Sequence, residues 1–196
     1  MKRFFSATSV DLHGLSEYLD SLDNRTRIRE VRSLGPKEQA LLFDQARGFR
    51  PLSLEDFVPA NVPPLRQVIH YGKNSLPAFT IFEKRFCRPA PGERNAAGLL
   101  WGYNEQPLRR LTGPGYFVVR AAPEGEVVID YCEIPPSTAS RPGGWPRILP
   151  NSARLSRFIY YRTKDYMRGV STHVSIGRAT RDGRVMNNWF VLCREE

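Results

Sequence analysis

Two runs of alternating residues meet at a tight turn in the segment Val174-Ser-Ile-Gly-Arg-Ala-Thr-Arg-Asp182-Gly183-Arg-Val-Met-Asn-Asn-Trp-Phe-Val-Leu-Cys193. An Asp-Gly pair between two such runs favours a two-residue type I′ turn, because both positions tolerate a positive φ. The segment therefore predicts an antiparallel hairpin. With Asp182 and Gly183 as the turn, Ile176 is expected to lie opposite Trp189.

The two faces of this hairpin differ in composition. One face is mostly apolar and is expected to face a core: Thr172, Val174, Ile176, Trp189, Val191 and Cys193. The other face is small and mixed: His173, Ser175, Gly177, Ala179, Met186, Asn188, Phe190 and Leu192. A sheet with one dense face and one small, partly polar face is typical of a barrel lumen or of a surface that faces a ligand.

A second hairpin is predicted at Pro123-Glu124-Gly125-Glu126. With Glu124 and Gly125 as the loop, Asp130 lies opposite Val119, in a row that also holds Phe117, Val128 and Cys132. A buried carboxylate either pairs with a cation or has a raised pKa. Asp130 is thus the one charge that the strand patterns place inside the sheet, although a register slip of one residue would turn it to solvent.

The rest of the chain divides into a helical part and a strand-rich part. In the first part, leucines recur at helical spacing from residue 12 to residue 22, Asp23 or Asn24 suits the cap of a second helix, and Pro36 suits the first turn of a third. A Pro-rich connector follows at residues 58–64. Beyond it, strand-like runs are expected near residues 66–71, 79–87, 97–104, 115–122, 126–134, 156–163, 171–180 and 184–193.

These patterns predict an α+β fold class, in which an N-terminal helical segment packs on a curved, mostly antiparallel β-sheet or barrel of about seven to eight strands. The helical segment is expected over residues 1–58 and the sheet or barrel over residues 59–196, with both parts forming one compact domain. The chain has 196 residues, of which 41% are hydrophobic and 25% charged, and this composition indicates a globular protein.

Positive charge is concentrated in the strand-rich part. The chain carries a net charge of +9, and residues 1–58 hold nine basic and nine acidic side chains, so the whole excess lies in residues 59–196. The densest part runs from Ser140 to Arg168. It favours an anionic partner such as a carboxylate, a phosphate or a nucleic acid, although a solvated basic face would have the same composition.

No motif in the sequence indicates a metal or a cofactor. The three cysteines, Cys87, Cys132 and Cys193, are far apart and match no metal-ligand spacing, which favours free thiols in a reducing compartment. The N-terminal residues lack the apolar stretch of a signal peptide, and no run approaches the roughly 18 apolar residues of a membrane span. We therefore expect a cytoplasmic protein with no metal, no cofactor and no membrane span.

Three residues are candidates for proton transfer: His173, Asp130 and His70. A general base needs an orienting carboxylate, and His173 with Asp130 would form such a dyad if both face the lumen. His70 ends a predicted strand beside Lys73 and Asn74, a polar group suited to hydrogen-bonding a ligand. The alternative for each histidine is an interior side chain without chemistry, and no P-loop, nucleophile-elbow or HExxH motif accompanies them.

Candidates for ligand binding combine amides, aromatic rings and cations. Arg154 and Arg157 are placed near a pocket opening, where they would pair with a carboxylate or a phosphate. The basic side chains around them split between two strand faces, which weakens a continuous nucleic-acid groove. The Pro- and Gly-rich segment 135–153 is either a lid over this site or a flexible surface insertion. The full set of candidates is Arg154, Arg157, Tyr103, Asn104, Lys73 and Asn188.

Three functions are consistent with these patterns, in order of preference. The first is a small-molecule-binding β-barrel with a mixed apolar and polar pocket for an anionic or amphipathic ligand. The second is a cofactor-independent enzyme (an isomerase, cyclase or hydrolase) that uses His and Asp in the same cavity. The third is a nucleic-acid-binding module that acts through the basic C-terminal half.

Overall fold

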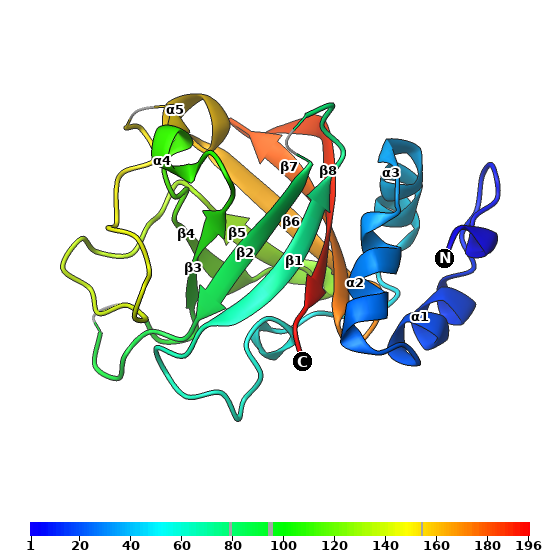
Figure 1. Cartoon of the computed structure of the whole chain (residues 1–196), viewed down its shortest axis with the longest axis horizontal. Coiled ribbons are helices and arrows are strands. Elements are labelled where there is room, and N and C mark those ends of the chain that lie inside the picture. Colours follow the sequence, from blue (N-terminus) through cyan, green and yellow to red (C-terminus); the bar gives the residue numbers. More distant parts are fainter. Residues whose placement is uncertain (79, 94–95, 154) are drawn as a thin grey trace.

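The central element of the protein is a closed β-barrel, seen in a computed structural model that describes residues 1–78, 80–93, 96–153 and 155–196 (Figure 1). Each strand pairs antiparallel with the next one in the chain, and β8 closes the barrel against β1. The predicted α+β fold class is confirmed, with eight strands. They are β1 (Val68–Asn74), β2 (Ile81–Cys87), β3 (Leu100–Glu105), β4 (Phe117–Ala121), β5 (Val127–Asp130), β6 (Thr163–Gly169), β7 (Val174–Arg181) and β8 (Arg184–Arg194).

Helices lie on one side of the barrel and at its ends (Figure 1). The N-terminal helices α2 and α3 contact β8, and α3 also contacts β7. Of the two predicted caps, Asp23 is the one that caps α2, by accepting a hydrogen bond from the Thr26 amide at 3.0 Å, while Asn24 is the first residue of that helix. As predicted, Pro36 begins α3. The helices are η1 (Lys2–Phe4), α1 (Leu12–Asp20), α2 (Asn24–Arg32), α3 (Pro36–Gln45), η2 (Leu54–Asp56), α4 (Arg109–Thr112), η3 (Pro123–Gly125) and α5 (Ser156–Ile159).

The dense face of the C-terminal hairpin is the outer face of the barrel. Its side chains pack against the helices in one buried cluster that includes Leu15, Leu19, Val31, Leu42, Val174, Ile176, Val191 and Cys193. The small, mixed face consequently turns toward the lumen. Helices α1 to α3 therefore cover the outside of β7 and β8.

The turn of this hairpin is confirmed, but its register is not. Asp182 and Gly183 both have positive φ, as a type I′ turn requires. A β-bulge between residues 178 and 180 then shifts the pairing, so that Ile176 lies opposite Val191 instead of Trp189. Because the shift is two residues and side chains alternate between faces, every residue of the paired strands keeps its predicted face.

The second hairpin differs from the prediction by a single residue. Its turn, Pro123–Gly125, holds three residues, so Val118 and not Val119 lies opposite Asp130. A one-residue shift moves every side chain to the other face of the strand. Asp130 therefore lies on the outer face of the barrel, where its carboxylate is 2.7 Å from the ammonium of Lys164. The prediction that Asp130 faces the lumen is wrong.

The strand predicted at residues 156–163 is also wrong. Ser156–Ile159 form the short helix α5, and β6 begins only at Thr163. The apolar spacing of so short a run fits a helical turn as well as a strand, and the two cannot be separated by periodicity alone. As a consequence Asp165 and Met167, in the middle of β6, take inward positions.

One end of the lumen is filled by a solid apolar core, whose strand residues include Val68, Phe86, Leu100, Phe117, Val119, Val127, Ile129, Met167 and Leu192. Glycines make room for several of the large rings. A Cβ at Gly177 would lie 2.5 Å from the ring of Phe190, so the ring occupies the space that a larger side chain would need. Direct cross-strand partners of this kind occur three times, as Gly72–Phe82, Gly102–Phe117 and Gly177–Phe190.

The Pro- and Gly-rich segment 135–153 packs on the outer wall of the barrel. Trp145 from this segment lies 4.9 Å from the ring of Tyr103, centroid to centroid. Asn151 donates hydrogen bonds from its side-chain amide to the carbonyl oxygens of Tyr116 at 2.7 Å and Tyr131 at 2.9 Å. These contacts tie the segment to β3, to the residue before β4 and to the residue after β5.

The glycine and phenylalanine pairs generate a stability prediction. Gly177→Ala should lower the free energy of unfolding by about 1–3 kcal/mol, because the new methyl group overpacks the space between Phe190 and Met167. Gly143→Ala is the matched control, since a Cβ there meets no atom within 4 Å, and its effect should stay below about 1 kcal/mol. Urea unfolding of both variants measures the difference, and equal effects would contradict the packing described.

Candidate functional site

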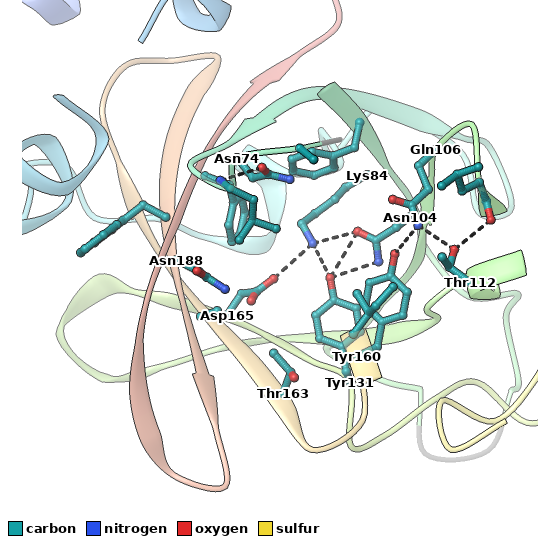
Figure 2. Close-up of a pocket in the computed structure, with 18 of the residues that line it drawn as sticks. Asn74, Lys84, Asn104, Gln106, Thr112, Tyr131, Tyr160, Thr163, Asp165 and Asn188 are labelled. Atoms are coloured by element: carbon teal, nitrogen blue, oxygen red, sulfur yellow. Dashed lines mark hydrogen bonds and ion pairs between the residues drawn. The ribbon is translucent and has the colours of Figure 1, made fainter. Parts of the chain in front are cut away.

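A cavity of about 310 Å³ occupies the end of the lumen next to α4 and α5 (Figure 2). Its volume lies at the lower end of the range of about 300–1,000 Å³ that is usual for small-molecule sites. Its apolar lining residues are Leu76, Ala78, Phe82, Pro107, Leu108, Ile159, Ala179, Trp189 and Phe190. Its polar lining residues are Asn74, Lys84, Asn104, Gln106, Thr112, Tyr131, Tyr160, Thr163, Asp165 and Asn188.

Lys84 and Asp165 mark the inner end of this cavity. Along β2 the next inward residue is Phe86, and along β6 it is Met167, and both belong to the solid core of the lumen. The cavity is therefore closed on the inner side. We refer to Lys84 and Asp165 as the lumen pair.

The lumen pair is held by a compact hydrogen-bond network (Figure 2). The Lys84 ammonium donates to the carboxylate of Asp165 at 3.2 Å, to the side-chain oxygen of Asn104 at 3.0 Å and to the hydroxyl of Tyr131. An ammonium has three protons, so each of them has an acceptor. The amide of Asn104 is fixed in turn by a 2.9 Å hydrogen bond to the carbonyl of Gly115.

Burial shifts the pKa values of the three titratable groups in the network, Lys84, Asp165 and Tyr131. Loss of solvent lowers the pKa of Lys84, and the neighbouring Asp165 carboxylate opposes that effect. Loss of solvent also raises the pKa of Asp165, against the attraction of Lys84, and it raises the pKa of Tyr131 well above its ordinary value. The proton between the two members of the lumen pair is therefore held less firmly by lysine, and more firmly by aspartate, than it is in water.

Aromatic rings supply the remaining surroundings of the Lys84 charge. The ammonium lies 4.9 Å from the ring centre of Phe190 and 5.2 Å from that of Phe117. Tyr131 stacks on Tyr160, with the ring centres 5.3 Å apart, and the Tyr160 hydroxyl accepts a hydrogen bond from Gln106 at 3.1 Å. The cavity thus combines apolar ring surfaces with a connected set of hydroxyl and amide groups.

The opening of the cavity is apolar and exposed. Leu76, Leu108 and Ile159 line it and are 40%, 37% and 40% exposed. On the two short helices beside the opening, Leu111 of α4 is 61% exposed and Phe158 of α5 is 70% exposed. Large apolar side chains gathered at a pocket entrance are typical of a site that admits apolar molecules.

Two of the residues expected to bind a ligand line this cavity, Asn104 and Asn188. Arg157 lies exposed on α5, the helix that contributes Ile159 to the opening. Arg154 lies outside the described residues. The side chain of Lys73 lies on the outer face of β1, because Gly72 and Asn74 take the inward positions.

Tyr103 is on the outer wall instead of in the cavity. Its ring is buried beneath the segment 135–153, and its hydroxyl donates to the carboxylate of Glu105 at 3.1 Å. The alternation of β3 explains this placement, since Asn104 faces the lumen and its neighbour Tyr103 must face outward.

The dyad of His173 and Asp130 is not formed. The side chain of His173 lies 3.5 Å from the carboxylate of Glu196, whereas Asp130 pairs with Lys164 on the outer wall. His70 does face the lumen, but within the solid core, where its Nε2 lies 3.0 Å from the carbonyl oxygen of Phe57. None of the three lines the cavity.

Lys84 and Asp165 were both missed by the sequence analysis, although a signal for each is present. Lys84 alternates with Phe82 and Phe86, so a strand with two phenylalanines facing inward must carry this lysine inward as well. Asp165 alternates with Thr163 and Met167 in the same way. The second signal was hidden because the sequence predicted a strand at residues 156–163, whereas β6 begins only at Thr163.

Comparisons of the chain with protein-family models, with curated proteins and with solved structures gave no significant match. Among the described residues, no helix is both long and apolar enough to span a bilayer, and no group of three or more His, Cys, Asp or Glu side chains is arranged to hold a metal ion. The class of the protein is therefore defined by its own geometry, a closed antiparallel β-barrel with an apolar lumen cavity and a buried ion pair at its inner end.

Removal of one member of the lumen pair should be far more harmful than removal of both. Lys84→Met or Asp165→Leu alone leaves an uncompensated buried charge and should lower the free energy of unfolding by about 3–5 kcal/mol. The double variant restores charge balance with apolar side chains and should lie within about 2 kcal/mol of the natural protein. Urea unfolding of the four proteins measures the coupling.

The matched control for this cycle is Lys2→Met, which removes an exposed lysine from its 3.6 Å ion pair with Glu38 near the N-terminus. Its effect should be about 1 kcal/mol or less. Strictly additive losses in the Lys84 and Asp165 variants would show that the two charges are not coupled.

His70 generates a prediction about acid stability. Burial lowers the pKa of His70 to about 3 from an ordinary value of 6.5, so the folded protein keeps the ring neutral where the unfolded chain would bind a proton. The free energy of unfolding should therefore rise as the pH increases from about 3 to about 6.5, and it should fall again by the same amount on acidification.

The variant His70→Phe should flatten this pH dependence, even though it also loses the hydrogen bond to Phe57. His13→Phe, at an exposed histidine of α1, is the matched control and should leave the slope unchanged. The measurement is urea unfolding at several pH values across that range, and an unaltered slope in His70→Phe would refute the assignment.

Proposed function

We propose that the protein binds a medium-sized amphipathic small molecule inside the barrel. The observation that carries this proposal is the cavity itself, which remains open in the lumen although the other end of the same lumen is packed solid. An unfilled apolar space lowers the stability of a protein, because its walls lose the contacts that a filled core would supply. A cavity retained beside exposed apolar residues is best explained by an occupant.

The arrangement of the walls favours one orientation of the ligand. Its apolar body would lie against Phe82 and Phe190, near the apolar opening. Its polar end would reach the amides of Asn104 and Asn188 in the interior. The few polar groups would then fix the orientation, while the rings supply most of the contact area.

The charges of the cavity favour a ligand whose buried end is neutral. Lys84 already has Asp165 as its counter-ion, so an anionic group at the inner end would lie beside a second negative charge and would find no unpaired cation in Lys84. An anionic ligand would instead place its charge at the opening, where Arg157 lies exposed on α5. Both arrangements keep the apolar part of the ligand in the lumen.

The basic C-terminal half gives weaker support to nucleic-acid binding. Arg168 is buried, with its guanidinium 2.6 Å from the carboxylate of Glu126 and 3.9 Å from the ring centre of Phe43. Lys164 pairs with Asp130. These cations stabilise the fold and are therefore not free to neutralise phosphates.

Blocking the cavity should abolish binding without unfolding the protein. Ala179 lines the cavity from β7, and Ala179→Phe would place a ring in the space proposed for the ligand. The dissociation constant of 1-anilinonaphthalene-8-sulfonate, an apolar anionic fluorescent probe, should rise at least about tenfold in this variant. Fluorescence titration measures the constant.

The matched control is Val185→Phe, which adds the same volume at a side chain that is 60% exposed on β8. It should bind the probe as the natural protein does. Equal binding by Ala179→Phe, or no binding by the natural protein, would contradict the proposal.

A further inference from the structure

The inner end of the cavity carries the amine of Lys84, and ligand binding alone does not require a nucleophile there. Among the described lining residues, Lys84 is the one that bears an amine. Its side chain is only 3% exposed, and Asp165, Asn104 and Tyr131 hold the ammonium in place. A lysine in this setting has the parts of a carbonyl-capturing site, namely a positioned amine, an adjacent proton acceptor and an apolar space for the substrate.

The ion pair also stabilises this position less than apolar side chains would. A buried pair of charges often stabilises a protein less than apolar side chains of similar volume, because both ions lose their hydration. Phe86 and Met167, the next inward residues, show that the same strands fill the lumen with apolar side chains one step further along. The change from apolar to charged residues occurs where the cavity begins, which points to a chemical role.

We propose that Lys84 captures an apolar aldehyde or ketone in the cavity as an imine, with Asp165 moving the protons. This inference rests on the proposed function, since the carbonyl compound must occupy the same cavity. The neighbouring apolar surfaces of Phe82 and Phe190 would hold the hydrocarbon part of the compound. The carbonyl group would lie at the inner end, within reach of the amine.

The reaction balances without any further reagent. A proton passes from the Lys84 ammonium to the Asp165 carboxylate, which lies 3.2 Å away, and leaves a neutral amine. The nitrogen lone pair then attacks the carbonyl carbon, a C–N bond forms, the C=O π bond breaks, and the oxygen takes the proton from Asp165.

Loss of water completes the imine. The nitrogen gives its next proton to Asp165, which passes it to the hydroxyl group of the carbinolamine. That group leaves as water while the nitrogen lone pair forms the C=N bond. The product is a protonated imine that carries the one positive charge that Lys84 carried before, and Asp165 is again its carboxylate counter-ion.

Both pKa shifts described above assist this sequence. A lysine in water is protonated and therefore not nucleophilic, whereas burial lowers the pKa of Lys84 and so raises the share of neutral amine. Burial raises the pKa of Asp165, which makes it a better proton acceptor. Tyr131 hydrogen-bonds the same ammonium and holds the nitrogen in place during the exchange.

Reductive trapping with decanal tests the proposal. The intact protein is incubated with decanal near neutral pH, sodium borohydride is added, and the product is analysed by intact-mass measurement and peptide mapping. The expected result is one adduct per chain, heavier by the mass of decanal less one oxygen, on Lys84. The chain has five lysines, and the other four, Lys2, Lys37, Lys73 and Lys164, serve as internal controls.

Two variants separate a positioned reaction from random labelling. Asp165→Asn keeps the amine but removes the proton acceptor, and it should slow the labelling of Lys84 by about a hundredfold. Lys164→Arg removes a lysine on the outer wall and should leave the labelling of Lys84 unchanged. If Asp165→Asn does not fold, the peptide map of the natural protein still decides the question.

Displacement of 1-anilinonaphthalene-8-sulfonate distinguishes the two proposals. If decanal displaces the probe and labels Lys84, both proposals are supported. If decanal displaces the probe while Lys84 stays unmodified, the cavity binds ligands and the imine proposal is overturned. If decanal neither displaces the probe nor labels Lys84, and the probe itself does not bind, both proposals fail.

Discussion

The ion pair between Lys84 and Asp165 crosses the barrel lumen and separates its solid core from its cavity. The two residues come from β2 and β6, which are four strands apart in a closed eight-stranded barrel and so face each other across the lumen. Such a pair is stable inside a protein only when its remaining hydrogen-bonding capacity is satisfied. Asn104 and Tyr131 meet that condition, and the lining of the cavity depends on their positions.

The rest of the fold confines access to one end of the lumen. The other end is filled by aromatic rings, with His70 stacked on Phe57 at a centroid distance of 5.4 Å and hydrogen-bonded to its carbonyl group. Helices α1 to α3 and the segment 135–153 cover different parts of the outer wall (Figure 1). Two short helices with exposed apolar residues, α4 and α5, lie at the open end, together with Leu76 from the loop between β1 and β2.

Alternation along the strands made the fold predictable, and turn lengths limited what could be predicted about the site. The C-terminal hairpin kept its faces despite a bulge, because a two-residue shift preserves alternation, and Asn188 accordingly lines the cavity. One extra residue in the turn before β5 instead sent Asp130 to the outer wall. Lys84 and Asp165 became partners only through closure of the barrel, which brings together strands that are 81 residues apart in the chain. No local pattern carries that information.

Crystals of the protein pressurised with xenon would test the central claim most directly, because dry apolar cavities bind this gas. The account predicts a xenon atom in the lumen, in contact with Phe82 and Phe190 and on the open side of the Lys84–Asp165 pair. It would be contradicted by a lumen without xenon, in which side chains or a chain of ordered water molecules fill the space between these rings.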